Sequence, residues 1–298
     1  MKRTFYPFLL TLLTAACQQQ KPTGQTASAS LAPPDAGLSA AASKPVAQAV
    51  APADSLTVEM RATLRQVDLS KLLLAPQPGF SMALDGFFGT NPQRLSLAIL
   101  QASRDSLRPE LVHIRGKARW QKQVTSFTGD ICFTRLSDYF DQGLLLSQGE
   151  ESFVQDTVGE AGNIINARAY SASATFRLLS EAPASYVLVG ETLLDFWLTD
   201  KGITGLIHSP AEGAILEKAP TKGSGLLLSG RWQNAADKVG RPFLVSSDVF
   251  LLSPGLIKDF GIGDRGAQVN PKYAKLGWNN YWENDEWWVD SPKPKLNL

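Results

Sequence analysis

From Phe80 onward, apolar residues recur at every second position over short stretches of the chain. Leu95, Leu97 and Ile99 alternate with Arg, Ser and Ala, and the run from Tyr170 to Leu178 repeats the pattern. Because successive side chains of a β-strand point to opposite faces, this period is typical of strands with one buried face. The pattern therefore favours a β-rich domain.

Further segments have the composition of strands and are separated by Gly, Pro and Asp residues. Between two of them, Asp200-Lys201-Gly202 predicts a hairpin turn, since glycine readily adopts a positive φ. Short strands with such punctuation predict a mainly β fold, an antiparallel sandwich or barrel-like domain spanning residues 55–298. The additional strand segments are 111–120, 124–133, 186–198, 203–208, 225–233 and 243–252.

One N-terminal helix is predicted ahead of the strands, and Asp54 or Ser55 is able to cap its first turn. Its apolar residues recur at helical spacing, so we expect it to lie against the domain. These residues are Leu56, Met60, Leu64, Val67 and Leu74.

Two segments of the predicted sheet share a short sequence. Arg119-Trp120-Gln121 and Arg231-Trp232-Gln233 each follow an apolar run. A duplicated β unit would produce this repeat and would give two similar lobes, residues 80–160 and 165–255. Coincidence is the alternative, because the match is only three residues long.

Residues 17–54 are rich in Gln, Ala, Ser, Thr and Pro, and no aromatic residue occurs between residue 17 and Phe80. Such a stretch buries too little apolar surface to offset the entropy lost on ordering. Its prolines interrupt any long helix. The sequence therefore predicts a disordered tether with a root-mean-square reach on the order of 35 Å.

Residues 1–16 have the three parts of an export signal. Lys2 and Arg3 form a charged start, residues 8–13 are apolar, and small residues precede Cys17. The apolar run is too short to span a bilayer, which takes roughly 20 residues. We therefore predict a cleavable signal peptide.

The segment Leu13-Thr14-Ala15-Ala16-Cys17 resembles the lipobox of bacterial lipoprotein precursors cut by signal peptidase II. It departs from that pattern at Thr14, where the family usually has Leu. The resemblance implies that Cys17 is acylated, with palmitate among its chains, and anchors the protein to a membrane of the cell envelope. Two or more acyl chains give stable anchoring. Gln18, in place of the Asp of inner-membrane retention, favours the outer membrane; the alternative is a secreted protein cut near Ala16.

The charge of the chain bears on its partners. With Lys2 and Arg3 removed from the 29 basic residues, 27 basic residues face 28 acidic ones, and the cations are scattered along the domain. Nucleic-acid-binding proteins carry a basic excess on one face, so we expect no nucleic-acid partner.

Besides Cys17, the chain has only Cys132, which leaves that thiol without an intrachain disulfide partner. We interpret Cys132 as a buried small side chain; a catalytic thiol would need His113 or His208 as its base.

The sequence contains no motif typical of catalysis, metal binding or nucleotide binding, and we expect no cofactor. Two histidines are too few for a three-histidine metal site. Paired carboxylates that cleave a glycan have no fixed sequence spacing, so an enzyme of that class stays open. The candidate acids are Asp130, Asp138, Asp141, Asp195, Glu283, Asp285 and Glu286.

The most unusual concentration of residues lies in the C-terminal aromatic segment, residues 273–290. It holds four of the seven tryptophans, Trp278, Trp282, Trp287 and Trp288, together with Tyr273 and Tyr281. One interpretation is that this segment closes the end of the barrel or sandwich with its rings buried. A second is a glycan-binding or glycan-cleaving platform formed by Trp278, Tyr281, Trp282, Trp287 and Trp288, and a third is membrane contact.

The first of these interpretations leads to a lipid-anchored envelope protein with a non-catalytic domain. The second adds a glycan or other envelope component as partner. A lipocalin-like carrier of an apolar ligand is a further alternative, and it requires an interior cavity of several hundred Å³.

Overall fold

The computed structural model describes residues 56–74, 83–138, 168–181, 186–199, 202, 204–207, 220–234, 237–263, 266–283 and 286–290. All of them belong to one compact unit, residues 50–298. The predicted signal peptide, Cys17 and the predicted tether lie outside the described residues.

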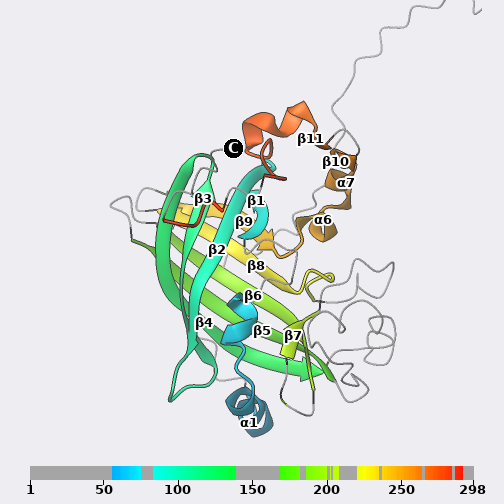
Figure 1. Cartoon of the computed structure of the whole chain (residues 1–298). Helices are drawn as coiled ribbons and strands as arrows, with labels where there is room; N and C mark the ends of the chain where they lie inside the picture. Colours follow the sequence, from blue (N-terminus) through cyan, green and yellow to red (C-terminus); the bar gives the residue numbers. More distant parts are fainter. Residues whose placement is uncertain are drawn as a thin grey trace, which may run out of the picture. The chain divides into compact units, whose positions relative to one another are not determined.

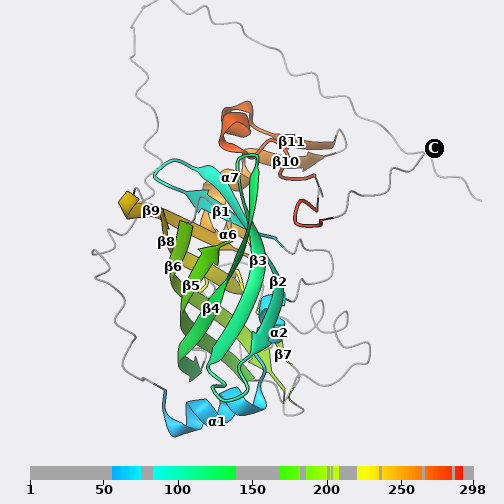
Figure 2. The same ribbon diagram turned by 90° about the vertical axis from the view of Figure 1, so that its left-hand side faces the viewer.

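The described part of the chain forms a closed, antiparallel β-barrel (Figures 1 and 2). Each of its eight main strands pairs with its neighbours along the chain, and β9 pairs with β1 to complete the ring. A ninth strand, β7 (Thr204–Leu206), extends the sheet beside the end of β6. The prediction of a mainly β, antiparallel barrel-like domain is thus confirmed. The ring consists of β1 (Ala83–Phe88), β2 (Gln93–Arg104), β3 (Leu111–Trp120), β4 (Gln123–Asp138), β5 (Arg168–Ser180), β6 (Tyr186–Leu198), β8 (Leu226–Asn234) and β9 (Asp237–Ser246).

Glycines allow the strands to curl into this ring. A Cβ atom on Gly129 would collide with the carbonyl oxygen of Arg177, and one on Gly190 with that of Ser229. Each glycine therefore lets the neighbouring strand approach more closely than any other residue permits. Register shifts in β2, β4 and β8 add local bends, and glycine kinks with bulges are the usual means of closing a small barrel.

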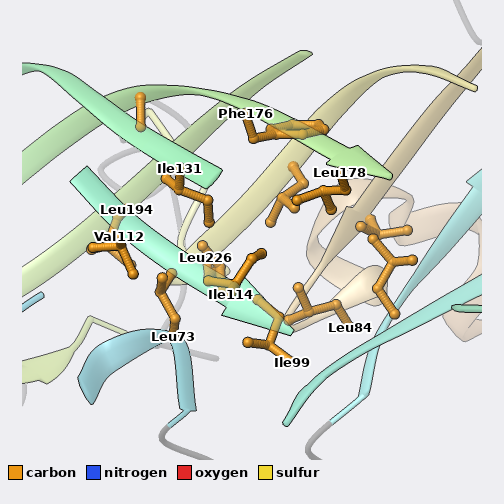
Figure 3. Packing of buried hydrophobic residues seen from close by; sticks show 14 of the residues in the cluster. Leu73, Leu84, Ile99, Val112, Ile114, Ile131, Phe176, Leu178, Leu194 and Leu226 are labelled. Atoms are coloured by element: carbon orange, nitrogen blue, oxygen red, sulfur yellow. The ribbon is translucent and has the colours of Figure 1, made fainter. Parts of the chain in front are cut away.

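The barrel interior is filled by apolar side chains (Figure 3). Phe127, Ile131 and Leu178 have no exposed surface. A ligand-sized cavity would leave exposed surface on the side chains around it, so these residues are packed against one another instead. Polar side chains also face this interior: Thr192 is fully buried, and burial raises the pKa of the Tyr186 phenol to about 12.

Two short helices close one end of the barrel (Figure 2). They are α1 (Val58–Gln66) and α2 (Ser70–Leu74), and both contribute leucines to the interior cluster. The sequence predicted one helix capped by Asp54 or Ser55, which lie outside the described residues. In the structure Thr57 caps α1 by accepting a hydrogen bond from the Met60 amide, and residues 67–69 separate the helices.

Aromatic rings gather at the other end of the barrel. Phe88 lies 5.0 Å from Trp120 and 5.4 Å from Trp232, measured between ring centroids, and Tyr186 stacks on Trp232. The repeated Arg-Trp-Gln sequence thus places two tryptophans in one cluster. The two predicted lobes each contribute strands to a single ring, and their origin by duplication stays a prediction.

The chain after β9 contains short elements that the sequence did not predict. The strand expected over residues 243–252 ends at Ser246, because Asp248 caps a helix by accepting a hydrogen bond from the Phe250 amide. The new elements are α6 (Val249–Leu252), α7 (Pro254–Ile257), β10 (Phe260–Gly263), β11 (Gly266–Val269) and the 3₁₀ helix η2 (Pro271–Leu276). We call their residues, 247–263, 266–283 and 286–290, the C-terminal cover.

Candidate functional site

The C-terminal cover packs on the outer wall of the barrel, the face of the sheet turned away from the interior. Phe87 of β1 points outward and joins a second hydrophobic core with Trp278 and Phe260 of the cover. Trp278 is 0% exposed, and its indole N–H donates a hydrogen bond of 2.6 Å to the carbonyl oxygen of Pro92. The segment therefore lies against the wall and the β1–β2 turn, whereas the sequence suggested that it closes the end of the barrel.

A buried ion pair lies beneath this cover. The Arg94 guanidinium donates to both carboxylate oxygens of Asp85, at 2.8 and 3.1 Å, and Ser96 donates to the same carboxylate. The Arg94 carbon Cζ lies 5.6 Å from the ring centroid of Trp278 and 5.1 Å from that of Tyr281. The aromatic rings therefore shield the pair from water and interact with its cation.

Three of the predicted ligand-binding residues are packed within the protein at this place. Trp278, Tyr281 and Trp282 all contact the second hydrophobic core, and burial raises the pKa of Tyr281. The ring planes of Trp278 and Tyr281 meet at 43°, and those of Tyr281 and Trp282 at 80°. These three rings do not form a flat platform for a sugar.

Trp287 and Trp288 differ from the other aromatic residues of the cover. Both are half-buried, and they meet edge to face, with ring planes at 84°. The Arg119 guanidinium of β3 lies 4.8 Å from the centroid of Trp287, and Lys117 forms an ion pair of 2.5 Å with Asp290. Arg119 thus supplies a positive charge beside these two rings, while the charge of Lys117 is balanced by Asp290.

The remaining sequence candidates are scattered over the domain. Cys132 is half-buried, whereas the sequence suggested a buried side chain, and His208 lies outside the described residues. His113 lies on the outer wall between Asp130, at 2.7 Å, and Asp105, at 3.2 Å. Hydrogen bonds to Asp130 and Asp105 raise the pKa of His113. Among the described residues, no group of three or more His, Cys, Asp or Glu side chains is arranged to hold a metal ion.

One predicted carboxylate, Asp195, is fully buried on the outer wall of β6. It accepts hydrogen bonds from the Ser171 hydroxyl at 2.7 Å and from both the amide and the hydroxyl of Thr221. Burial raises the pKa of Asp195. The stretch that follows Thr221 also contacts this residue, since the Asp195 amide donates a hydrogen bond of 2.8 Å to the carbonyl oxygen of Gly225. Among the residues that the structure describes, Asp195 is therefore held in a structural contact and is shielded from solvent.

A cleft of about 670 Å³ lies at the helix-capped end, between the two helices and the β2–β3 loop. Arg104, in its wall, donates to the carbonyl oxygens of Leu64, Arg65 and Val67 and so caps the end of α1. Nothing in the sequence indicated this cleft, because its lining comes from segments that have no motif in common. Arg65, Asp68 and Lys71 come from the helical segment, and residues 102–107 and 109 come from β2 and the loop after it.

In the parts of the chain that the structure describes, no helix is long and apolar enough to cross a membrane. Comparison with protein-family models, with curated proteins and with solved structures found no match.

Proposed function

We propose that this chain is a lipid-anchored protein of the bacterial cell envelope whose barrel is a non-catalytic scaffold. The packed interior carries this proposal. Phe127, Ile131 and Leu178 have no exposed surface, and every strand of the ring contributes side chains to the interior cluster. Neither a substrate nor an apolar cargo has room there, so the interior argues against a lipocalin-like carrier. Any ligand then binds on the outer wall or at one of the two ends of the barrel.

The proposed anchor is Cys17, which follows the lipobox-like residues 13–16. A linker of nearly forty residues separates Cys17 from Leu56, the first described residue. Its Pro-rich and Ala-rich composition supports a tether that holds the barrel outside the cytoplasm, with the outer membrane favoured by Gln18.

Radiolabelled palmitate tests the anchor directly. We expect label on the protein expressed in a bacterial host, and loss of label together with altered electrophoretic mobility in the variant Cys17→Ser. Cys132→Ser is the matched control and should keep the label. Absence of label from the unaltered protein, or label that persists in Cys17→Ser, would refute the anchor.

A second candidate function is glycan binding at Trp287 and Trp288. It is supported by the half-buried state of both rings and by the Arg119 guanidinium beside Trp287, which favours an acidic sugar. Affinity electrophoresis in gels containing an acidic polysaccharide should retard the protein, and Trp287→Ala with Trp288→Ala should abolish the retardation. Equal retardation of the variant and the unaltered protein would exclude this site.

A further inference from the structure

The helix-capped end of the barrel combines unpaired cations with a cleft. Arg65 and Lys71 both line the cleft and are exposed, and neither forms an ion pair with any residue that the structure describes. Arg104 adds a third cation to the lining, although its Nη1 is engaged with the carbonyl oxygens at the end of α1. This arrangement suits an anion that approaches from solvent.

The two acidic residues of the lining are already engaged within the protein. Asp68 accepts hydrogen bonds from the amide and the hydroxyl of Ser70, at 3.1 and 2.6 Å. Asp105 accepts from the amides of Leu107 and Arg108 and contacts His113 through its second oxygen. These contacts hold both carboxylates within the protein, whereas Arg65 and Lys71 are exposed to solvent.

Two exposed apolar side chains lie at the same end of the barrel as these cations. Leu107 lines the cleft and is 89% exposed, and Val58 on the first turn of α1 is 79% exposed. The hydrogen bonds from Asp105 fix the loop that presents Leu107. An ion pair of 3.4 Å between Arg61 and Glu110 links α1 to the same loop. Apolar tips next to cations are typical of surfaces that enter the interface of an anionic membrane.

We propose that this end of the barrel docks on an anionic phospholipid surface. Lipid phosphates lie against Arg65 and Lys71, while Leu107 and Val58 enter the interface between headgroups and acyl chains. The proposal rests on the proposed lipid anchor, since the chain that precedes Leu56 joins α1 at this end and leads back to Cys17. A tether raises the effective concentration of the surface, so that weak contacts suffice for docking.

The test uses the acylated protein reconstituted in vesicles, with an environment-sensitive fluorophore attached through Leu107→Cys. Cys132→Ser is included in every variant to remove the second thiol. In vesicles containing phosphatidylglycerol we expect emission to shift to shorter wavelength, and in pure phosphatidylcholine we expect no shift. Because these vesicles contain no other protein, a shift reports contact with lipid.

Removal of the positive charges that line the cleft makes the test quantitative. Each cation near an anionic surface favours binding about fivefold, so Arg65→Gln with Lys71→Gln should lower the docking equilibrium about 25-fold. The matched control is Lys122→Gln with Arg177→Gln. Lys122 lies on the turn at the other end of the barrel and Arg177 lies on β5, and both are exposed. This variant loses the same charge and should leave the shift unchanged.

Three outcomes would overturn docking: no shift with phosphatidylglycerol, an equal loss in the control variant, or reversal of the shift by millimolar inorganic phosphate, which would assign the cleft to the free anion. Failure of the anchor has a different signature, because the protein would then not float with the vesicles at all.

Discussion

The barrel interior and the C-terminal cover are both well buried, yet they are built differently. The interior is a continuous cluster of aliphatic and aromatic side chains from every strand of the ring. The cover instead encloses an ion pair, Asp85 with Arg94, beneath Trp278 and Tyr281. Apolar packing tolerates small shifts, but a buried charge depends on the exact position of its partner. The interior therefore determines whether the domain folds, and the cover determines which parts of its outer wall are accessible.

The largest effect should come from the interior. Phe127→Ala should lower the free energy of unfolding by about 4 kcal/mol, because it removes a fully buried ring and leaves a void. Urea denaturation followed by circular dichroism measures this. Val124→Ala, at a 45% exposed position of the same strand, should stay within about 0.5 kcal/mol of the unaltered protein. A cost below about 1 kcal/mol for Phe127→Ala would indicate a hollow interior.

The ion pair under the cover should give the next largest effect. Asp85→Ala leaves Arg94 buried without its carboxylate and should cost about 3 kcal/mol of unfolding free energy. Adding Arg94→Leu should recover most of that loss, since the uncompensated charge is then gone. If the double variant is no more stable than Asp85→Ala, the charge is not what makes the cover sensitive.

A smaller and local effect is expected from Trp278→Phe. The ring remains apolar, but the hydrogen bond to Pro92 is lost, which should cost about 1 kcal/mol. Hydrogen exchange separates the two regions. The Tyr281 amide, which donates to the Trp278 carbonyl, should exchange faster, while amides paired between β5 and β6 should not change. Equal acceleration in both regions would mean that cover and barrel unfold as one unit.

The smallest expected effect is a pH dependence of the stability, which arises from His113 on the outer wall. The raised pKa of His113 means that its charged form is favoured in the folded state, so its contribution to stability is fully present below pH 6.5. That contribution is lost as pH rises through the folded pKa. Since His113 is half exposed, the difference between the unaltered protein and His113→Gln should stay below about 1 kcal/mol. Thermal melts near pH 6 and pH 9 should show a gap only at the lower pH.

Much of the barrel was predictable from local patterns, but its closure and the cover were not. The alternation at Leu95, Leu97 and Ile99 predicted a strand because it reports a face that is buried in the fold. The bounds predicted for 111–120 and 186–198 match β3 and β6. Ring closure depends on pairing between β9 and β1, which lie far apart in the chain and leave no local pattern.

The candidate functional site was likewise predictable only in part. The sequence identified the aromatic segment 273–290, because four tryptophans so close together are unusual. It did not separate buried Trp278 from half-buried Trp287, since burial is decided by Phe87 and Pro92 on a distant hairpin. The cleft at Arg65 and Lys71 was missed for a similar reason, because its other wall is the β2–β3 loop.

The barrel interior is packed, and any ligand must therefore bind on its outside. This can be checked by titrating the purified protein with a fluorescent long-chain fatty acid in the absence of vesicles. We expect no saturable one-to-one binding. Saturable binding that is displaced by unlabelled fatty acid and abolished by Ala174→Phe, a substitution that fills the interior, would contradict it.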